Sequence, residues 1–473
     1  MLIMLDSCKL SHTRANPAID RISELPDEIL EYVTSELTLR DAVRTRALSA
    51  RWNRVAISSR PTLVFDWINM FETPQSSQFW NTCDEHWCPC DQFRFRFVKS
   101  VNQFLGSIER SSAWGTKEFT IRFCLGSCYQ DDIVKWVRFA LAKGVEKLVL
   151  RLHCVERCRK MPYDPGLIHQ HNRSFPRLPP PDGSVLGPKS LHLEACCPGP
   201  SLTNNQTFGS VETLRLFYVD LRDYDLSSMF SCLKKLGVLT FEHCALPRAV
   251  NLTPLFVLES FSVVSSFGLK KITISNVKLV IFQCICRPPP ELEISSRVGA
   301  SNIEEFFFGS YEGSSQYVFT RLPRDMPKLR HLALYVSKNQ KWADGVPASL
   351  VTFAHVTQLN LIVSWDCFAL HISKIIHALK AFPRLRRLGI ITKKTYATEG
   401  SIVNFKHDEH TYEHLEEIEF TGFCGTPNEI RQFLAYFEAH APSLKQLVIN
   451  RNMHSWRKNK KRLMEDYAPF LET

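Results

Sequence analysis

A short hydrophobic motif recurs along most of the chain and limits what the chain can fold into. The motif places apolar residues at its first, fourth and sixth positions. It occurs as VEKLVL (145–150), VETLRL (211–216), LGVLTF (236–241), LESFSV (258–263), LKKITI (269–274), IEEFFF (303–308), LRHLAL (329–334), VTQLNL (356–361), LRRLGI (385–390), LEEIEF (415–420) and LKQLVI (444–449). The fourth positions of the last six copies are separated by 26, 27, 29, 30 and 29 residues. So regular a spacing predicts one structural unit per copy.

The last two apolar positions of each motif point to one face of a β-strand, because strand side chains alternate with a period of two. A single strand cannot bury them, whereas stacked strands bury a continuous ladder covered by helices or turns. With a period of about 20–29 residues, this pattern predicts a curved α/β leucine-rich-repeat solenoid over residues 117–450. The residue between the two apolar positions then faces the concave surface. Candidate target-binding residues are therefore Arg215, Thr240, Asn360, Glu419 and Val448, although an ordinary solvated strand face would vary in the same way.

Two stretches interrupt the array. Residues 155–188 contain seven prolines and no clear motif, which predicts a long excursion loop. The triple proline at 288–290 predicts a break in the ladder between residues 272 and 306. Residues 67–116 contain the aromatic run FRFRFV, and we expect this connecting segment to pack on the array.

Residues 20–66 predict three short helices. Pro26 suits a first helical turn, and the acidic Asp27 and Glu28 that follow favour a helix N-terminus. Thr38 with Asp41 three residues later resembles a capping box that opens the second helix, and Ser49 can cap the third. Such a module has too small a core to bury all its apolar side chains, so we expect it to have a partner. An ordinary helical cap on a larger domain is the alternative.

This helical module resembles the plant F-box, in its opening DRISELPDEIL and in the later RDAVRTRALSARW. The resemblance implies docking on a Skp-type adaptor, and through that adaptor on a cullin ubiquitin ligase. The residues that match the adaptor-binding positions, or the core beneath them, are Leu25, Pro26, Ile29, Leu30, Val33, Val43, Leu48 and Trp52.

Residues 413–450 resemble the FBD-type C-terminal region of plant F-box/leucine-rich-repeat proteins. Gly422 and Gly425 allow a turn, Pro427 begins a helix, and Pro442 ends it before a last repeat strand. The expected organisation is a disordered N-terminus (1–19), an F-box (20–66), the connecting segment (67–116), leucine-rich repeats (117–404), FBD-like terminal repeats (405–450) and a basic tail (451–473).

The sequence carries no familiar catalytic motif. Walker-type, GxGxxG, GxSxG and HExxH patterns are absent, and no CxxC pair is present to build a zinc-based ubiquitin-transfer domain. Three weak constellations are Cys83 with His86, Cys88 and Cys90, then His407 with His410 and His414, and the pairs Cys124/Cys128 and Cys154/Cys158. The first two lack the usual spacing of a structural metal site, and for the cysteine pairs we expect buried thiols. We expect no catalytic residue, no metal and no cofactor.

The net charge of +10 comes mainly from the tail, because Arg451 to Arg462 contains six basic residues and no acidic one. This short run predicts a nuclear-import patch or a solvated end. Because the rest of the chain has no basic face, nucleic-acid binding is not favoured. The short apolar start does not resemble a signal peptide, and no run approaches the length of a membrane span. We therefore expect no membrane association, free thiols, and a location in the cytoplasm or nucleus.

The leading hypothesis is a non-catalytic substrate receptor of a Skp/cullin/F-box ubiquitin ligase. The F-box would bind the adaptor and the solenoid would bind a target protein that the sequence does not identify. The alternative is a leucine-rich-repeat scaffold that acts outside any ubiquitin ligase.

Overall fold

The N-terminal module is helical. The computed structural model describes residues 22, 24–52, 55, 60–71, 91–108, 116–152, 187–196, 206–275, 277–286, 289–294, 302–310, 315–336, 351–363, 375–392, 410–422 and 427–450. Helix α1 (Asp27–Glu36) begins after Pro26 and carries Asp27 and Glu28 in its first turn. Helix α2 (Leu39–Thr45) begins at Thr38, whose hydroxyl accepts a hydrogen bond from the backbone N–H of Asp41. This contact forms one half of the predicted capping box.

One long parallel sheet of 14 strands runs through the rest of the chain. Its strands follow chain order: β1 (Thr62–Phe65), β2 (Glu118–Arg122), β3 (Lys147–Arg151), β4 (Ser190–Glu194), β5 (Thr213–Phe217), β6 (Val238–Glu242), β8 (Ser260–Val264), β10 (Ile281–Ile285), β12 (Glu305–Ser310), β13 (His331–Val336), β14 (Gln358–Val363), β15 (Arg387–Thr392), β16 (Glu417–Thr421) and β17 (Gln446–Asn450). Parallel strands that pair in the order in which they follow along the chain are what a solenoid requires. The predicted α/β fold class is therefore confirmed.

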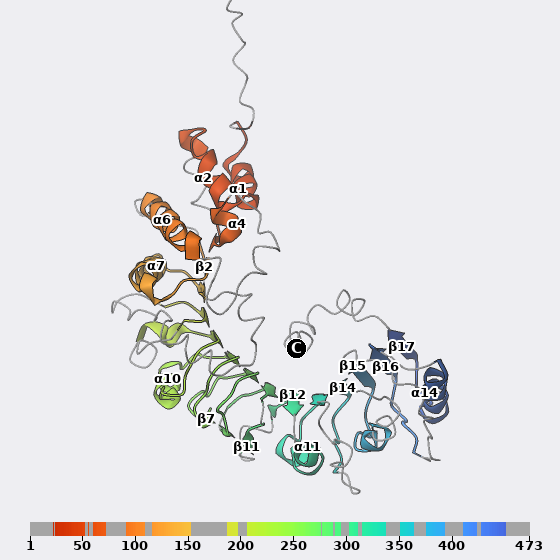
Figure 1. The fold of residues 1–473 in the computed structure, drawn as a ribbon. Coiled ribbons are helices and arrows are strands. Elements are labelled where there is room, and N and C mark those ends of the chain that lie inside the picture. Colours follow the sequence, from red (N-terminus) through yellow and green to blue (C-terminus); the bar gives the residue numbers. More distant parts are fainter. Residues whose placement is uncertain are drawn as a thin grey trace, which may run out of the picture.

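The sheet curves, and the helices lie on its outer, convex side (Figure 1). They are α6 (Asp91–Ile108), α7 (Gln130–Ala142), α10 (Leu226–Cys232), α11 (Ser315–Thr320), α12 (Leu322–Asp325) and α14 (Pro427–His440). Helix α14 begins at Pro427 as predicted. It buries Phe433 and Phe437, and the Phe433 ring contacts the Phe420 ring of β16. No described helix lies on the inner, concave side of the sheet (Figure 1).

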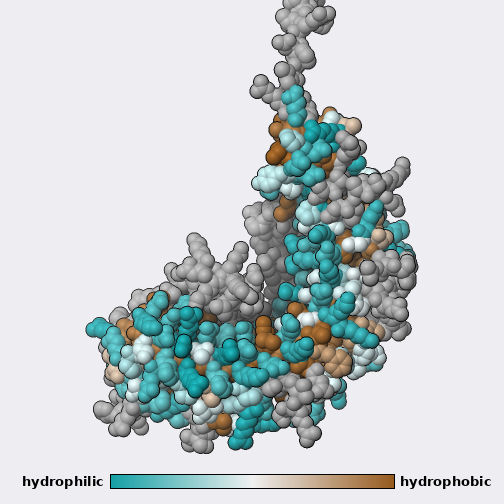
Figure 2. All heavy atoms as spheres, turned by 180° about the vertical axis from the view of Figure 1, so that it is seen from behind, coloured by the Kyte–Doolittle hydropathy of each residue, from teal (hydrophilic) through white to brown (hydrophobic). Residues whose placement is uncertain are grey.

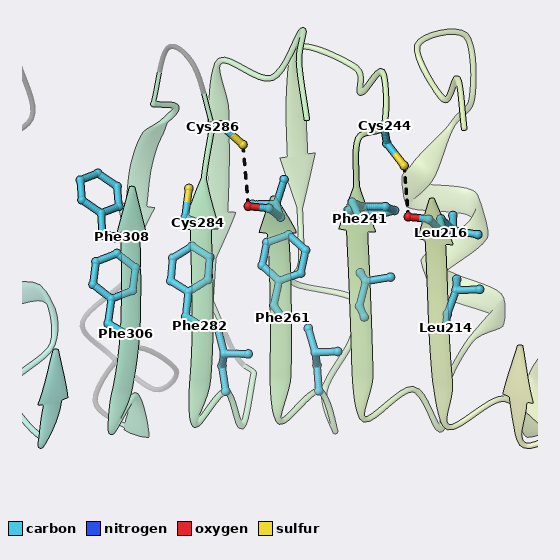
Figure 3. Close-up of a cluster of buried hydrophobic side chains, with 14 of the residues drawn as sticks. Leu214, Leu216, Phe241, Cys244, Phe261, Phe282, Cys284, Cys286, Phe306 and Phe308 are labelled. Carbon is cyan, nitrogen blue, oxygen red and sulfur yellow. Dashed lines mark hydrogen bonds between the residues drawn. The ribbon is translucent and has the colours of Figure 1, made fainter. Parts of the chain in front are cut away.

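Leucine and phenylalanine side chains form two buried rows between the sheet and the helices. Leu214, Phe261, Phe282 and Phe306 lie in one row and Leu216, Phe241, Cys284 and Phe308 in the next (Figure 3). The strands are in register, so each motif position meets the same position of the neighbouring repeat. The Phe261 and Phe282 rings stack with centroids 5.7 Å apart, and those of Phe282 and Phe306 lie 5.1 Å apart.

The ladder does not break between residues 272 and 306, and that prediction was wrong. Strand β10 pairs with β8 on one side and with β12 on the other. The LKKITI copy instead forms β9 (Lys271–Ile274) in a separate parallel sheet with β7 (Ala249–Asn251) and β11 (Glu291–Ile294). In this part of the array each repeat carries a second short strand, so two apolar strand patterns occur per repeat. The local pattern alone does not tell which of the two strands joins the main sheet.

The sheet begins earlier than residue 117. Strand β1 lies inside the range expected for the helical module and pairs in parallel with β2. The connecting segment contributes Trp67, Phe71 and Phe97 to the same buried core, through the short helix α4 (Trp67–Met70) and helix α6. The rings of Phe97 and Phe123 stack with centroids 4.1 Å apart.

Helix α2 and a buried arginine attach the helical module to the solenoid. Leu39 belongs to the solenoid core, and its backbone N–H donates to the Asn69 side-chain oxygen at 2.8 Å. The guanidinium of Arg60 donates to the carbonyl oxygens of Thr34 and Leu37 at the C-terminal end of α1. The backbone oxygen of Arg60 in turn accepts from the Thr116 hydroxyl at 2.8 Å. These bonds link α1 to both β1 and β2.

None of the described cysteines forms a disulfide. Cys196, Cys244, Cys284 and Cys286 are buried, and burial raises the pKa of the Cys244 thiol to about 12. Cys128 is exposed and Cys124 is half-buried, so the expectation of buried thiols was wrong for Cys128. The pair Cys154/Cys158 lies outside the described residues.

Candidate functional site

Helix α1 separates a buried face from an exposed apolar face. Leu30 and Thr34 are buried, whereas Ile29, Tyr32 and Val33 are 45%, 66% and 36% exposed. These three residues are three and four positions apart, so they share one helix face. We call them the α1 patch. Figure 2 shows hydrophobic side chains gathered on this module at the top of the molecule.

The eight predicted adaptor-binding residues divide into three groups. Pro26, Ile29, Val33 and Leu48 are exposed. Leu30 and Trp52 are buried with Val55 in the module's own core, and Leu25 packs against that core. Val43 instead packs against the solenoid core. Only the exposed group is free to meet a partner without unfolding the module.

The predicted target-binding residues lie on the concave side of five strands but at separate places along the solenoid. Arg215 and Thr240 are register neighbours on β5 and β6. Asn360 and Glu419 lie on β14 and β16, with Gly389 of β15 between them. The Asn360 amide nitrogen lies 2.7 Å from the His331 ring nitrogen Nε2, so this residue already has a side-chain partner. Of the five residues, only Arg215 is exposed, and the other four are half-buried.

A polar hollow surrounds Arg215 on the concave side of β3–β6. We call it the concave hollow, and its volume is about 680 Å³. It is lined by Lys147, Arg151, Ser190, His192, Glu194, Thr213, Arg215, Phe217, Tyr218 and Glu242. Strand register places Arg151, Glu194, Phe217 and Glu242 side by side on four successive strands.

Aromatic rings form part of the wall of the hollow. The His192 and Phe217 rings stack with centroids 4.7 Å apart, and the Tyr218 and His243 rings stack at 4.9 Å. Tyr218 and His243 each directly follow a strand and have φ angles of 53° and 51°. Such left-handed backbone is uncommon for side chains of this size. Here it recurs at the same register position, because the backbone N–H of Tyr218 donates to the Glu242 oxygen and that of His243 to the Val264 oxygen.

Charges in the hollow are unevenly paired. Arg151 lies 3.1 Å from Glu194, and Lys147 lies 3.1 Å from Glu118 of β2. Desolvation, together with the nearby Glu194 carboxylate, raises the pKa of Glu242 to about 7, and the positive charge of Arg215 partly opposes this shift. Burial lowers the pKa of His192, so this imidazole is neutral at pH 7. Among the described residues, no carboxylate lies within ion-pair distance of Arg215.

The metal hypotheses find no support in the described part of the chain. No group of three or more His, Cys, Asp or Glu side chains there could hold a metal ion. Cys83, His86, Cys88, Cys90 and His407 lie outside the described residues, as does the basic tail. No described helix is long and apolar enough to cross a membrane.

Family models match both the N-terminal helical module and the solenoid of this chain. Residues 22–63 match the family model of the F-box domain. Residues 108–468 match the model "At1g61320/AtMIF1, LRR domain", which covers most of the chain. The chain belongs to the plant F-box/leucine-rich-repeat family.

Curated relatives of this F-box/LRR chain come from Arabidopsis thaliana. The F-box protein At3g59000 is 32% identical over 132 residues, which are 28% of this chain and 24% of that protein. The F-box/FBD/LRR-repeat protein At1g13570 is 27% identical over 220 residues (42% and 45%), and the putative FBD-associated F-box protein At3g50710 is 24% identical over 225 residues (48% and 39%). The matched stretches therefore span less than half of each relative. Their FBD descriptions agree with the FBD-like features of the F-box/LRR chain.

Most residues of the concave hollow were not among the sequence-predicted sites of this F-box/LRR chain. Strand β4 carries the pattern SLHLE, whose two leucines alternate as the last two apolar positions of the repeated motif do. This strand lies outside the copies of the motif given above. Arg151, Glu194, Phe217 and Glu242 lie two residues beyond the predicted middle position. Extending the alternation by two residues places them on the same face of the sheet. That extension is the signal that would have found them.

Proposed function

We propose that the chain is a substrate receptor of a Skp/cullin/F-box ubiquitin ligase. The α1 patch binds a Skp-type adaptor, and the concave side of the solenoid binds the target protein. The observation that carries this proposal is the α1 patch itself. Ile29, Tyr32 and Val33 remain exposed on a helix whose other face packs Leu30 against Trp52 and Val55.

Burying these side chains supplies binding energy. Full burial of one large aliphatic side chain contributes about 1.5–3 kcal/mol. A few central apolar and aromatic residues commonly dominate a protein interface. The α1 patch has that composition, and its helix is already formed in the free chain, which lowers the entropic cost of binding.

The receptor acts by proximity and performs no covalent step. A target held on the concave face has a raised effective concentration near the ubiquitin carrier that the ligase recruits. Proximity requires a constant orientation of the F-box relative to the solenoid. The Arg60 and Asn69 contacts hold the F-box in such an orientation.

We expect Ile29→Asp combined with Val33→Asp to weaken adaptor binding by about 100-fold or more, because both charges would have to be desolvated in the interface. Affinity for a purified Skp-type adaptor measures this effect. The matched control is Ile68→Asp with Phe95→Asp, because these residues are also apolar and are even more exposed, at 61% and 72%, but lie outside the F-box.

The control should bind the adaptor as the unaltered chain does. Equal binding by both double variants would contradict the assignment. These surface changes are better suited than changes at Leu25, which packs on the F-box core. Adaptor binding without recovery of a cullin from plant extract would favour the scaffold alternative.

A further inference from the structure

We propose that the concave hollow recognises an anionic side chain of the target, a carboxylate or a phosphoryl group, through Arg215. This inference rests on the proposed receptor function, because it names the chemistry by which the solenoid selects its target. It is carried by the position of Arg215, the pairing of its neighbours and the shape of the hollow.

Arg215 is the cation that remains available in the hollow. The other two positive side chains are held by acidic groups of neighbouring strands, Arg151 by Glu194 and Lys147 by Glu118. Arg215 is exposed on β5, and the described residues offer it no ion-pair partner. A guanidinium presents donors in a planar fork that matches two oxygens of a carboxylate or phosphoryl group.

The summed charge of the hollow also favours an anion. Lys147, Arg151 and Arg215 contribute three positive charges, Glu194 contributes one negative charge, and Glu118 of β2, the partner of Lys147, contributes another. Glu242 is about half-protonated near pH 7, and His192 is neutral. The walls include the stacked His192 and Phe217 rings, which reduce the water around Arg215 and strengthen an ion pair formed there.

The alternative to an anionic side chain is a basic side chain of the target, and the hollow is less suited to bind it. Glu194 is already paired with Arg151. Glu242 is half-buried and near Glu194, and both effects raise its pKa and disfavour its charged form. A cation would also have to approach the exposed guanidinium of Arg215.

Glu242 makes anion binding sensitive to pH. The charged groups around its carboxyl group are Glu194 of β4 and Arg215 of β5, with His243 next to it in the chain. The facing residues of β8 are uncharged, namely Ser260, Ser262 and Val264. As pH rises through about 7, Glu242 gains a negative charge that repels a bound anion. Affinity for an anion should therefore fall as pH rises.

The test uses the full-length chain and four peptide pools with random flanks, whose central residue is glutamate, phosphoserine, serine or lysine. We expect selection of the glutamate or phosphoserine pool over the serine and lysine pools. The pool that binds better identifies the source of the anion. Arg215→Gln should weaken binding of the selected pool by about tenfold or more, because a charge-assisted bidentate contact is lost. Arg248→Gln, an exposed arginine outside the hollow, removes the same charge and should leave binding unchanged.

The pH arm uses a glutamate-centred peptide, whose charge is constant between pH 6 and pH 8. Its affinity should fall by about three- to tenfold over that range, and Glu242→Gln should abolish the fall. Equal effects of Arg215→Gln and Arg248→Gln, selection of the lysine pool, or no preference for an anionic pool would overturn the inference. Each of these results can occur with adaptor binding intact, so it is distinguishable from failure of the receptor function.

Discussion

Replacing Phe261 by alanine is expected to lower the free energy of unfolding of the solenoid by about 3–5 kcal/mol. Phe261 is 0% exposed, and its ring lies 5.7 Å from that of Phe282 in the same buried row and 6.1 Å from that of Phe241 in the next row. Because each repeat contacts only its neighbours, a cavity here weakens two interfaces at once. Urea denaturation followed by tryptophan fluorescence measures the loss.

Phe256→Ala is the matched control. It removes the same atoms five residues earlier, where the ring is 61% exposed. We expect its unfolding free energy to change by less than about 0.5 kcal/mol. A similar loss in both variants would show that the buried row of Phe261 does not carry the stability of the array.

Arg60→Met is expected to loosen the F-box from the solenoid at a cost of about 2–4 kcal/mol. The substitution keeps the apolar stem but removes the donors that the Thr34 and Leu37 carbonyls now use. Hydrogen bonds to charged groups contribute about 1.5–3 kcal/mol each, and buried carbonyls left without donors add a penalty. Amide hydrogen exchange in α1 should accelerate, while exchange in β13 to β16 should stay unchanged.

Arg46→Met serves as the comparison for Arg60. Arg46 also reaches across the junction, and its guanidinium donates to the Ser107 hydroxyl at 3.1 Å, but this bond lies at the exposed surface. We expect a much smaller change in α1 exchange. If the two variants behaved alike, the buried arginine would not be the main attachment of the F-box. For a receptor that acts by proximity, such an attachment decides where a bound target is held.

The helical part of the site was readable from local sequence. Pro26, Asp27 and Thr38 mark helix starts, and the structure begins α1 and α2 next to them. Local sequence could not tell which of Ile29 and Leu30 is buried, because both are aliphatic residues on one short helix. Which of them is buried depends on where Trp52 and Val55 pack, and that is decided by the fold of the whole module.

The concave hollow depended on contacts between distant parts of the chain. Arg151, Glu194, Phe217 and Glu242 are far apart in sequence, and only strand register makes them neighbours. The perturbed pKa of Glu242 has the same origin, because burial and a second carboxylate from another repeat produce it together. No local pattern contains that information.

By itself the sequence determined the α/β class, the repeat and the identity of the buried rows, because a period-two apolar strand can be stabilised only by stacking on copies of itself. Tertiary structure decided the continuity of the ladder through β10 and the separate sheet of β7, β9 and β11. It also decided which charges meet on the concave face. The physical reason is the distance along the chain over which each feature is set. Apolar alternation is contained within one strand, whereas register, burial and electrostatic pairing are properties of several strands together.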